Sequence, residues 1–280
     1  MDSKELIRLK NTATELRLNA LYMIHKAQSG HPGGALSVAD FVTACYFKFM
    51  NVDPSDPHWP ERDRFVLSKG HACPAQYAAL AMKGYFPMEV LDTLRKEGSM
   101  LQGHPSMNRC PGIDISTGSL GQGLACGAGM ALAAKLDGKD YKVYVAVGDG
   151  ECQEGEIWEA AQTAHKYKLD NLIVFVDNNN LQLDGTCDEV MPNIDLGKKF
   201  EAFGFDRYEI DGNDMAQVTA AIELANAVKN GRPKCLFGHT VKGKGVSYME
   251  NQCSWHGVAP NDAEYAQAVS ELKAQLIAEV

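Results

Sequence analysis

Two loops with oxygen-bearing side chains are the first candidates for chemistry in this sequence. Gly148-Asp149-Gly150 follows an apolar run, and Asn179 lies in a polar segment that follows the next apolar run. A carboxylate, an amide oxygen and a backbone carbonyl can bind a hard cation such as Mg²⁺ and still leave positions for phosphate oxygens. The glycines and a helix that starts near Glu154 would let the backbone approach a diphosphate. Ordinary turns after two strands are the alternative explanation.

Histidines beside glycines form a second group of candidates. Four of the eight histidines have this setting in loop-like sequence, and we take them as candidate catalytic residues: His31, His71, His104 and His256. An imidazole can donate to or accept from a hydroxyl group and can move a proton near neutral pH. A single histidine is more often a surface or core residue. Four in one sequence context favour a site for a polyhydroxylated substrate and an anionic cofactor.

Alternating helices and strands must position these loops. Apolar residues at helical spacing predict helices, and apolar runs between turn signals predict strands. The predicted helices cover about 4–28, 37–50, 74–84, 120–135, 154–168, 215–229 and 262–278. The predicted strands cover 64–68, 141–147, 171–177, 207–210 and 234–239, and a glycine-rich loop, 29–34, follows the first helix.

The segment 141–177 has the pattern of strand, crossover helix and strand. This pattern predicts parallel strands whose carboxyl ends lie on one edge of the sheet. The largely apolar second strand suits a sheet that is covered on both faces. We therefore predict an α/β fold with a doubly wound, mainly parallel sheet and helices on both faces. Residues 1–280 are expected to form a single domain with a C-terminal helix from about residue 262.

Composition and charge exclude several classes of protein. The formal net charge is -9 and no basic stripe is present, so nucleic acid is not expected as a partner. The N-terminus lacks the apolar core of a signal peptide, and no stretch approaches the roughly 18 apolar residues of a membrane span. The eight cysteines form no C-x-x-C pair, which argues against a zinc site and a disulfide framework. We expect a cytoplasmic protein with reduced cysteines and no membrane contact.

These motifs and their order resemble those of the thiamine diphosphate enzymes, and among them those of the transketolases. Gly148-Asp149-Gly150 followed by Asn179 resembles the diphosphate motif of that larger group. Further segments resemble transketolase motifs closely, so that the resemblance covers almost the whole sequence: Ser29-Gly30-His31-Pro32-Gly33-Gly34, Ser68-Lys69-Gly70-His71-Ala72, Gly103-His104-Pro105, Thr117-Gly118-Ser119-Leu120-Gly121-Gln122-Gly123, Thr240-Val241-Lys242-Gly243-Lys244-Gly245 and Trp255-His256-Gly257. Two positions depart from the pattern, because Ser119 stands where many transketolases carry proline and Val258 where some carry lysine.

The resemblance implies thiamine diphosphate and Mg²⁺ as cofactors. It implies that Asp149, Asn179 and the carbonyl of Leu181 bind the metal ion. The cofactor-binding residues that it implies are His71, Gly118, Ser119, Leu120, Asp149, Gly150, Glu154, Asn179, Lys242 and His256. In this family the four histidines surround the thiazolium ring, the diphosphate and the substrate hydroxyls. Solvated loop charges are the alternative for Lys242 and Lys244.

The family also implies a partner. It places a second domain after this one, with the carboxylate that activates the cofactor, whereas this sequence ends at Val280. The alternatives are a truncated fragment and a separate C-terminal subunit, as in split bacterial transketolases, and we expect the second, with two copies of each subunit. The expected reaction moves a two-carbon ketol unit from a ketose phosphate to an aldose acceptor. Glu154 would contact the partner's catalytic carboxylate, and the helix from Leu120 and the segment near Glu154 are candidate interfaces.

Other functions stay open at this point. One is another thiamine diphosphate enzyme, such as a deoxyxylulose phosphate synthase or a 2-oxo acid dehydrogenase component, or a transketolase for a nonstandard ketose. The loops of His31 and His104 favour ketose chemistry over 2-oxo acid chemistry. A second is a subunit that holds the cofactor and contributes no catalytic groups. An unrelated Mg²⁺-phosphate protein would account for Asp149 and Asn179 but not for the histidine loops.

Overall fold

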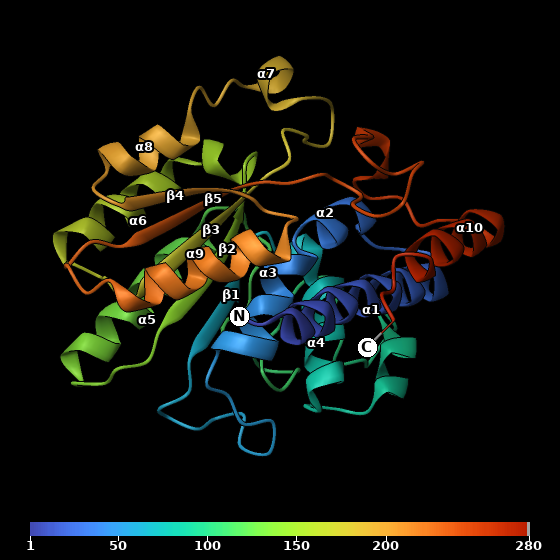
Figure 1. Cartoon of the computed structure of the whole chain (residues 1–280), viewed down its shortest axis with the longest axis horizontal. Helices are drawn as coiled ribbons and strands as arrows, with labels where there is room; N and C mark the ends of the chain where they lie inside the picture. The colour runs from blue at the N-terminus through green and yellow to red at the C-terminus, as the bar shows by residue number, and fades with distance from the viewer. Residues whose placement is uncertain (279–280) are drawn as a thin grey trace.

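A five-stranded parallel sheet lies at the centre of the structure, a computed structural model that describes residues 1–278 (Figure 1). The strand order is β1-β2-β3-β5-β4, and every neighbouring pair is parallel. The predicted α/β fold with a doubly wound parallel sheet is therefore confirmed. The strands are β1 (Arg64–Leu67), β2 (Val143–Gly148), β3 (Leu172–Asn178), β4 (Asp206–Asp211) and β5 (Lys234–His239).

Helices precede, connect and follow the strands. They are α1 (Ser3–Ala27), α2 (Pro32–Ser37), α3 (Ala39–Ala44), α4 (Cys73–Lys83), α5 (Gln122–Leu136), α6 (Gly155–Lys166), α7 (Cys187–Val190), α8 (Leu196–Ala202), α9 (Met215–Ala227) and α10 (Asp262–Lys273). Shorter turns are the π-helical η1 (Cys45–Phe49) and the 3-10 turns η2 (Gly70–Ala72), η3 (Met88–Thr93), η4 (Glu151–Gln153) and η5 (Cys253–Trp255). Within residues 1–278, no helix has the length and apolar character needed to cross a membrane.

Each face of the sheet is covered by its own layer of helices. Tyr144 and Phe175 point to one face, where they belong to an apolar core shared with α1, α3, α4 and α9. Val145 and Val174 point to the other face, toward α5, α6 and α8. Successive residues of a strand alternate between faces, so a sheet buried on both sides needs strands that are apolar throughout. Figure 1 shows the sheet between the two layers.

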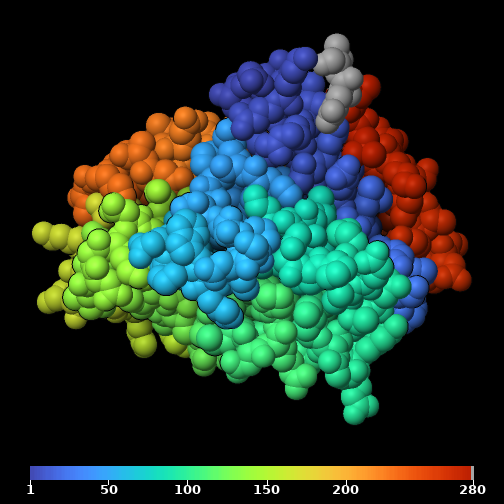
Figure 2. Space-filling model, turned by 90° about the horizontal axis from the view of Figure 1, so that it is seen from below, coloured from blue at the N-terminus to red at the C-terminus, as the bar shows by residue number. Residues whose placement is uncertain are grey.

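The C-terminal helix α10 packs against the N-terminal helix α1, and Figure 2 shows the blue N-terminal and red C-terminal segments side by side. The helix predicted to about residue 278 is too long, because α10 ends at Lys273. The chain then turns onto α1, where Asn11 Nδ2 donates to the Ile277 carbonyl at 2.8 Å and the Ile277 amide donates to Asn11 Oδ1 at 2.9 Å. These two hydrogen bonds replace a further helical turn.

The segment 29–50 also differs from the prediction. The expected loop 29–34 is short, because α2 already begins at Pro32, and the expected helix 37–50 is divided among the end of α2, α3 and η1. Proline is well tolerated at the first position of a helix, where its missing N–H has no partner to lose. At the other end of α2, Ser37 Oγ donates to Asp177 Oδ2 at 2.6 Å. This hydrogen bond fixes α2 against the end of β3.

The small-residue helix α5 approaches the sheet closely. It begins at Gln122, slightly later than predicted, after Gly121 with a φ of +91° that favours glycine. A Cβ atom added to Gly123 would lie 2.6 Å from Ser68 Cα, whereas nothing lies within 4 Å of a Cβ atom at Gly129. Two glycines of one helix therefore differ in whether a side chain fits.

We expect Gly123→Ala and Gly129→Ala to change the stability of the protein in opposite directions. Gly123→Ala forces α5 away from the backbone of Ser68 and should lower the free energy of unfolding by about 1–3 kcal/mol. Gly129→Ala adds helix propensity at an exposed position and should raise it by about 0.5–1 kcal/mol. Urea unfolding of the two variants measures the difference. Equal stabilisation by both would show that α5 does not approach β1 this closely.

Candidate functional site

The two predicted oxygen-rich loops lie side by side at the carboxyl edge of the sheet. Gly148 is paired with Asp177 in the parallel register of β2 and β3. The next residue, Asp149, donates its amide to the Asp177 carbonyl at 3.3 Å. The prediction that both loops open on one edge of neighbouring strands is therefore confirmed.

Asp149 is a buried carboxylate, and few positive charges lie close enough to compensate its negative charge. Its Oδ1 accepts from the Gly150 amide at 2.7 Å, and its Oδ2 accepts a short hydrogen bond from the Asn180 amide. Burial, and after it the negative charge of Asp177, raises the pKa of Asp149 to about 6. A cation bound beside this carboxylate would favour the ionised form, so the local electrostatics suit a metal ion.

The other two proposed metal ligands lie in the loop after β3. Asn179 Oδ1 accepts from the Leu181 amide at 3.1 Å. The Leu181 carbonyl, however, accepts from the ammonium group of Lys242 at 3.1 Å. The ammonium group of Lys242 therefore occupies the position beside the carbonyl that the resemblance assigns to Mg²⁺.

The protein donors suit a metal ion that also binds phosphate. In the described part of the chain, no group of three or more His, Cys, Asp or Glu side chains could hold a metal ion. One carboxylate, one amide oxygen and one carbonyl fill only part of the octahedral shell that Mg²⁺ prefers. The remaining positions would have to come from a diphosphate and water, so these residues fit a metal ion that arrives with its cofactor.

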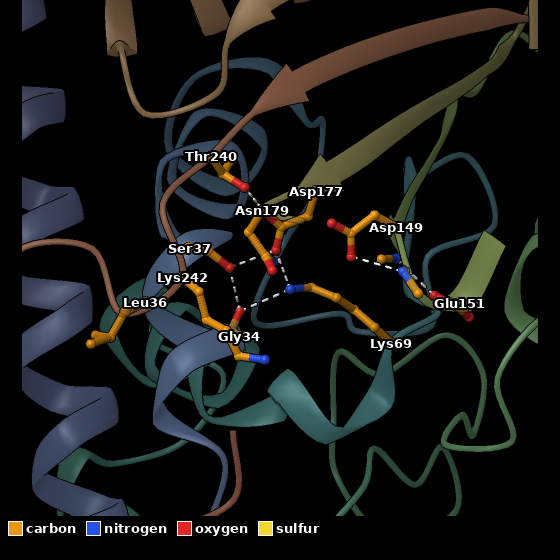
Figure 3. Close-up of polar contacts among 12 residues, drawn as sticks. Gly34, Leu36, Ser37, Lys69, Asp149, Glu151, Asp177, Asn179, Thr240 and Lys242 are labelled. Atoms are coloured by element: carbon orange, nitrogen blue, oxygen red, sulfur yellow. Dashed lines mark hydrogen bonds and ion pairs between the residues drawn. The ribbon is translucent and has the colours of Figure 1, made fainter. Parts of the chain in front are cut away.

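A buried ion pair between Lys69 and Asp177 organises this edge of the sheet (Figure 3). Asp177 also accepts from Ser37 Oγ at 2.6 Å and, in a short hydrogen bond, from Thr240 Oγ1. Lys69 Nζ donates in addition to the Gly34 carbonyl at 2.9 Å. The network joins the ends of β1 and β3 to α2 and to the loop after β5. Lys69 had no role assigned from the sequence, although it lies two residues before His71.

Glu151 is a further buried acid of the site, to which the sequence assigned no role. Its Oε1 accepts from Ser68 Oγ and from the Gly121 amide, and its Oε2 accepts from the Gly148 amide at 3.0 Å. Burial raises the pKa of Glu151. It links the turn after β2 to the loop before α5, and its place directly after Gly148-Asp149-Gly150 was the only signal in the sequence.

A cavity of about 320 Å³ opens above these residues. It is lined by many of the residues that the sequence assigned to the cofactor: His71, Leu120, Asp149, Gly150, Glu154, Asn179, Leu181, Lys242 and His256. It is also lined by residues that were not assigned: Gly34, Lys69, Gly148, Glu151, Gln153, Gln182 and Leu183. His31, His104, Gly118 and Ser119 do not line it. The predicted site residues therefore fall into two groups: those that line the cavity and those that lie around it.

The loop with Gly118 and Ser119 lies beside the cavity, against the turn that carries His71. Thr117 Oγ1 donates to the Leu67 carbonyl at 2.7 Å, which fixes the loop to the end of β1. A Cβ atom on Gly70 would lie 2.8 Å from the Gly118 amide nitrogen. The loop and the turn are thus in contact, and a ligand would meet them together.

Three of the four candidate histidines form one cluster. The ring centroids of His31 and His71 are 5.3 Å apart, those of His31 and His256 are 5.5 Å apart, and those of His71 and His256 are 5.0 Å apart. The fourth, His104, is exposed and packs against Gly118, since a Cβ atom there would lie 2.8 Å from its ring. Three of the four histidines that were grouped from the sequence therefore lie together in the structure.

The cluster is neutral at physiological pH. Burial, followed by the charge of Arg95, lowers the pKa of His31 to about 4, and burial, followed by the charge of Lys242, lowers the pKa of His256 to about 3. Burial also lowers the pKa of His71 well below its usual value, and burial and Arg95 lower that of His104. Imidazoles without charge can hydrogen-bond to hydroxyl groups without repelling the nearby lysines.

Lys242 connects the histidine cluster to the loop after β3. It is buried, and its Nζ lies 3.1 Å from the carbonyls of both Leu181 and Gln182 and 2.9 Å from His256 Nδ1. Burial, and after it the charge of Lys69, lowers the pKa of Lys242 to about 8. The alternative of a solvated loop charge is wrong for Lys242. Lys244, by contrast, is partly exposed and pairs with Glu250 at 3.7 Å.

The chain matches a known protein family over most of its length. The family described as transketolase, thiamine diphosphate binding domain, matches residues 9–276. The 6-deoxy-6-sulfo-D-fructose transketolase subunit SqwG of Clostridium sp. is 45% identical over 97% of this chain and 98% of its own length. An apulose-4-phosphate transketolase subunit from Phocaeicola vulgatus is 44% identical over 97% of this chain and 95% of its own length.

Solved transketolases share the fold. The crystal structure of transketolase from Campylobacter jejuni superposes with a TM-score of 0.90 at 33% identity and covers 98% of this chain. This chain spans 43% of that longer protein, and 41% of the transketolase from Leishmania mexicana, which superposes with the same TM-score of 0.90. The chain therefore belongs to the transketolase family, in which residues 9–276 match the thiamine diphosphate-binding domain.

Proposed function

We propose that this chain is the cofactor-anchoring subunit of a two-subunit transketolase, which moves a two-carbon ketol unit from a ketose phosphate to an aldose acceptor. The observation that carries the proposal is the cavity at the carboxyl edge of the sheet, where Asp149, Asn179 and the Leu181 carbonyl lie beside His71 and His256. Residues 1–280 would act as one thiamine diphosphate-binding domain, with Mg²⁺ as the second cofactor.

The chain's own residues would hold the cofactor from several sides. Asp149, Asn179 and the Leu181 carbonyl would bind Mg²⁺, and Lys242 would leave that carbonyl to contact the diphosphate. Gly118, Ser119 and Leu120 would cover the cofactor from the loop before α5, with Gly150, His71 and His256 on other sides of it. This assignment is supported by the burial of Asp149 and Lys242, which both gain from an opposite charge.

Thiamine diphosphate, when bound, supplies the carbanion stabilisation that cleavage beside a ketose carbonyl requires. The contribution of this chain would be to orient the sugar and to exclude water. His31, His71, His104 and His256 would hydrogen-bond to substrate hydroxyls and move protons at those oxygens. Their neutral state supports this role, because an uncharged imidazole has one donor and one acceptor nitrogen.

A separate C-terminal subunit would complete the active site, in an assembly of two copies of each subunit. Glu154 is exposed at the N-terminus of α6 and lines the cavity, where it would contact the partner's catalytic carboxylate. The loop after β3, in which Leu183 lines the cavity, exposes further apolar surface, with Leu183 62%, Met191 58% and Ile194 88% exposed. That loop is a better candidate interface than the glycine face of α5, which packs within the domain.

The substrate is proposed to be a ketose phosphate or a related sugar with a terminal anion. The names of two relatives refer to 6-deoxy-6-sulfo-D-fructose and to apulose-4-phosphate. Nonstandard ketoses should therefore be tested as donors beside the ordinary ketose phosphates. We propose a cytoplasmic location, which is supported by eight cysteines that are all free thiols.

The direct test is ketol transfer by the purified chain, alone and mixed with the protein encoded next to it as the candidate C-terminal subunit, in the presence of thiamine diphosphate and Mg²⁺. We expect turnover only in the mixture, with ketose phosphates, sulfofructose and apulose phosphate as donors. Turnover by the chain alone would refute the two-subunit proposal.

Asp149→Asn should weaken Mg²⁺-dependent binding of thiamine diphosphate by on the order of 100-fold, because it removes the only charged oxygen of the proposed metal site. Calorimetric titration of the reconstituted complex measures this loss. The matched control is Asp184→Asn, which changes an exposed carboxylate in the nearby loop and should leave the affinity unchanged. Equal affinities for the two variants would place the metal ion elsewhere.

His31→Ala and His104→Ala should each reduce ketol transfer by roughly 10- to 100-fold, the effect of losing one or two hydrogen bonds to the substrate. Both histidines lie outside the cavity lining, so cofactor affinity should change little. His58→Ala, at an exposed position remote in sequence from the histidine loops, is the control. Full activity of all three variants would favour a subunit that only binds the cofactor.

A further inference from the structure

Arg95 is a charged group at the histidine cluster that the proposed function does not use. Its Nη1 donates to Ser29 Oγ at 3.1 Å, and its Nη2 lies 3.3 Å from His31 Nδ1 and 3.5 Å from the Gly103 carbonyl. Within residues 1–278 the guanidinium forms no ion pair with a carboxylate. Its hydrogen bonds are therefore directed to the loops of His31 and His104.

The backbone around Arg95 is shaped to bring the guanidinium there. Arg95 has a φ of +60°, which is uncommon for a residue with a side chain, and its amide donates to the Leu101 carbonyl at 2.8 Å. A Cβ atom on Gly103 would lie 3.2 Å from Arg95 Cζ, tighter than most contacts. The left-handed backbone of Arg95 and the missing side chain of Gly103 thus both allow the guanidinium to lie close to the loop of His104.

The contact between Arg95 and His31 determines where the proton of His31 lies. A guanidinium group has five N–H donors and no acceptor, so His31 Nδ1 must provide the lone pair. We infer that Arg95 is a positioning residue that holds His31 as the Nε2–H tautomer, so that His31 presents a hydrogen-bond donor to a hydroxyl or carbonyl oxygen of the sugar. The part about the sugar rests on the proposed function, whereas the tautomer rests on the contact alone.

A second histidine shows the same arrangement. His256 Nδ1 lies 2.9 Å from Lys242 Nζ, which is also a donor without an acceptor when charged. The rings of His31 and His256 are nearly perpendicular, at 88°, with centroids 5.5 Å apart. Each imidazole is therefore held at Nδ1 by a cationic side chain, which leaves Nε2–H for a ligand.

The free side of His31 is open to such a ligand. A Cβ atom on Gly257 would lie 3.4 Å from His31 Nε2, so the missing side chain at Gly257 leaves space beside this nitrogen. No hydrogen bond to Nε2 is present among the described residues. With the proton at Nε2, His31 would donate to an oxygen of the substrate, so a proton that it moves there would pass from Nε2 to that oxygen.

The test is the tautomer of His31, measured by two-bond ¹H–¹⁵N correlation on the full chain with ¹⁵N-labelled histidine. His31→Gln assigns the resonances. We expect an unprotonated Nδ1 and a protonated Nε2 in the wild type, values that move toward the average of the two tautomers in Arg95→Ala, and partial recovery in Arg95→Lys, which keeps a donor. Arg109→Ala removes an exposed arginine of the neighbouring loop and should change nothing.

Activity provides a second readout in the reconstituted complex. Arg95→Ala should lower kcat/KM for ketol transfer by about tenfold, with partial recovery in Arg95→Lys. A proton on Nδ1 of His31 in the wild type, or equal spectra for Arg95→Ala and Arg109→Ala, would overturn the inference. The spectra need no turnover, so a complex without ketol transfer activity but with the expected tautomer would contradict the proposed function and leave this inference intact.

Discussion

The ion pair between Lys69 and Asp177 is the interaction on which the site depends. Both side chains are buried, at 2% and 0% exposure, where a charge without a partner is costly. Ser37, Thr240 and the Gly34 carbonyl supply the remaining hydrogen bonds. Segments from four parts of the chain are therefore held at one point, directly below the cavity. Such a network favours one arrangement of the edge, because loss of either charge leaves the other unpaired.

The charges above this pair are incompletely balanced. Arg95 contacts the histidine cluster, Lys242 lies between that cluster and the cavity, and Asp149 lines the cavity together with Glu151 and Glu154. Burial disfavours the charged forms of both Asp149 and Lys242. A diphosphate with its metal ion would bring a negative charge to the lysine and a positive charge to the carboxylate, and so relieve both. The edge is therefore suited to a ligand that carries both signs of charge.

Much of this edge followed from local sequence patterns, and the remainder required the fold. Apolar runs located β2 and β3, and parallel pairing then brought Asp149 and Asn179 together. The ion pair of Lys69 with Asp177 joins the turn after β1 to the end of β3, and no local pattern indicates which charges meet across a sheet. Arg95 was missed for the same reason, since its partners lie in two other loops. The division of the segment 29–50 was missed because the Ser37 contact with Asp177 is a tertiary one.

The central claim is that a metal-bound diphosphate binds at the ends of β2 and β3. A crystal structure of the reconstituted complex with thiamine diphosphate and Mg²⁺ tests it most directly. We predict Mg²⁺ bound by Asp149, Asn179 and the Leu181 carbonyl, with Lys242 Nζ moved from that carbonyl to a phosphate oxygen. A metal ion bound away from Asp149, or a diphosphate outside the cavity with Lys242 still on Leu181, would contradict the account.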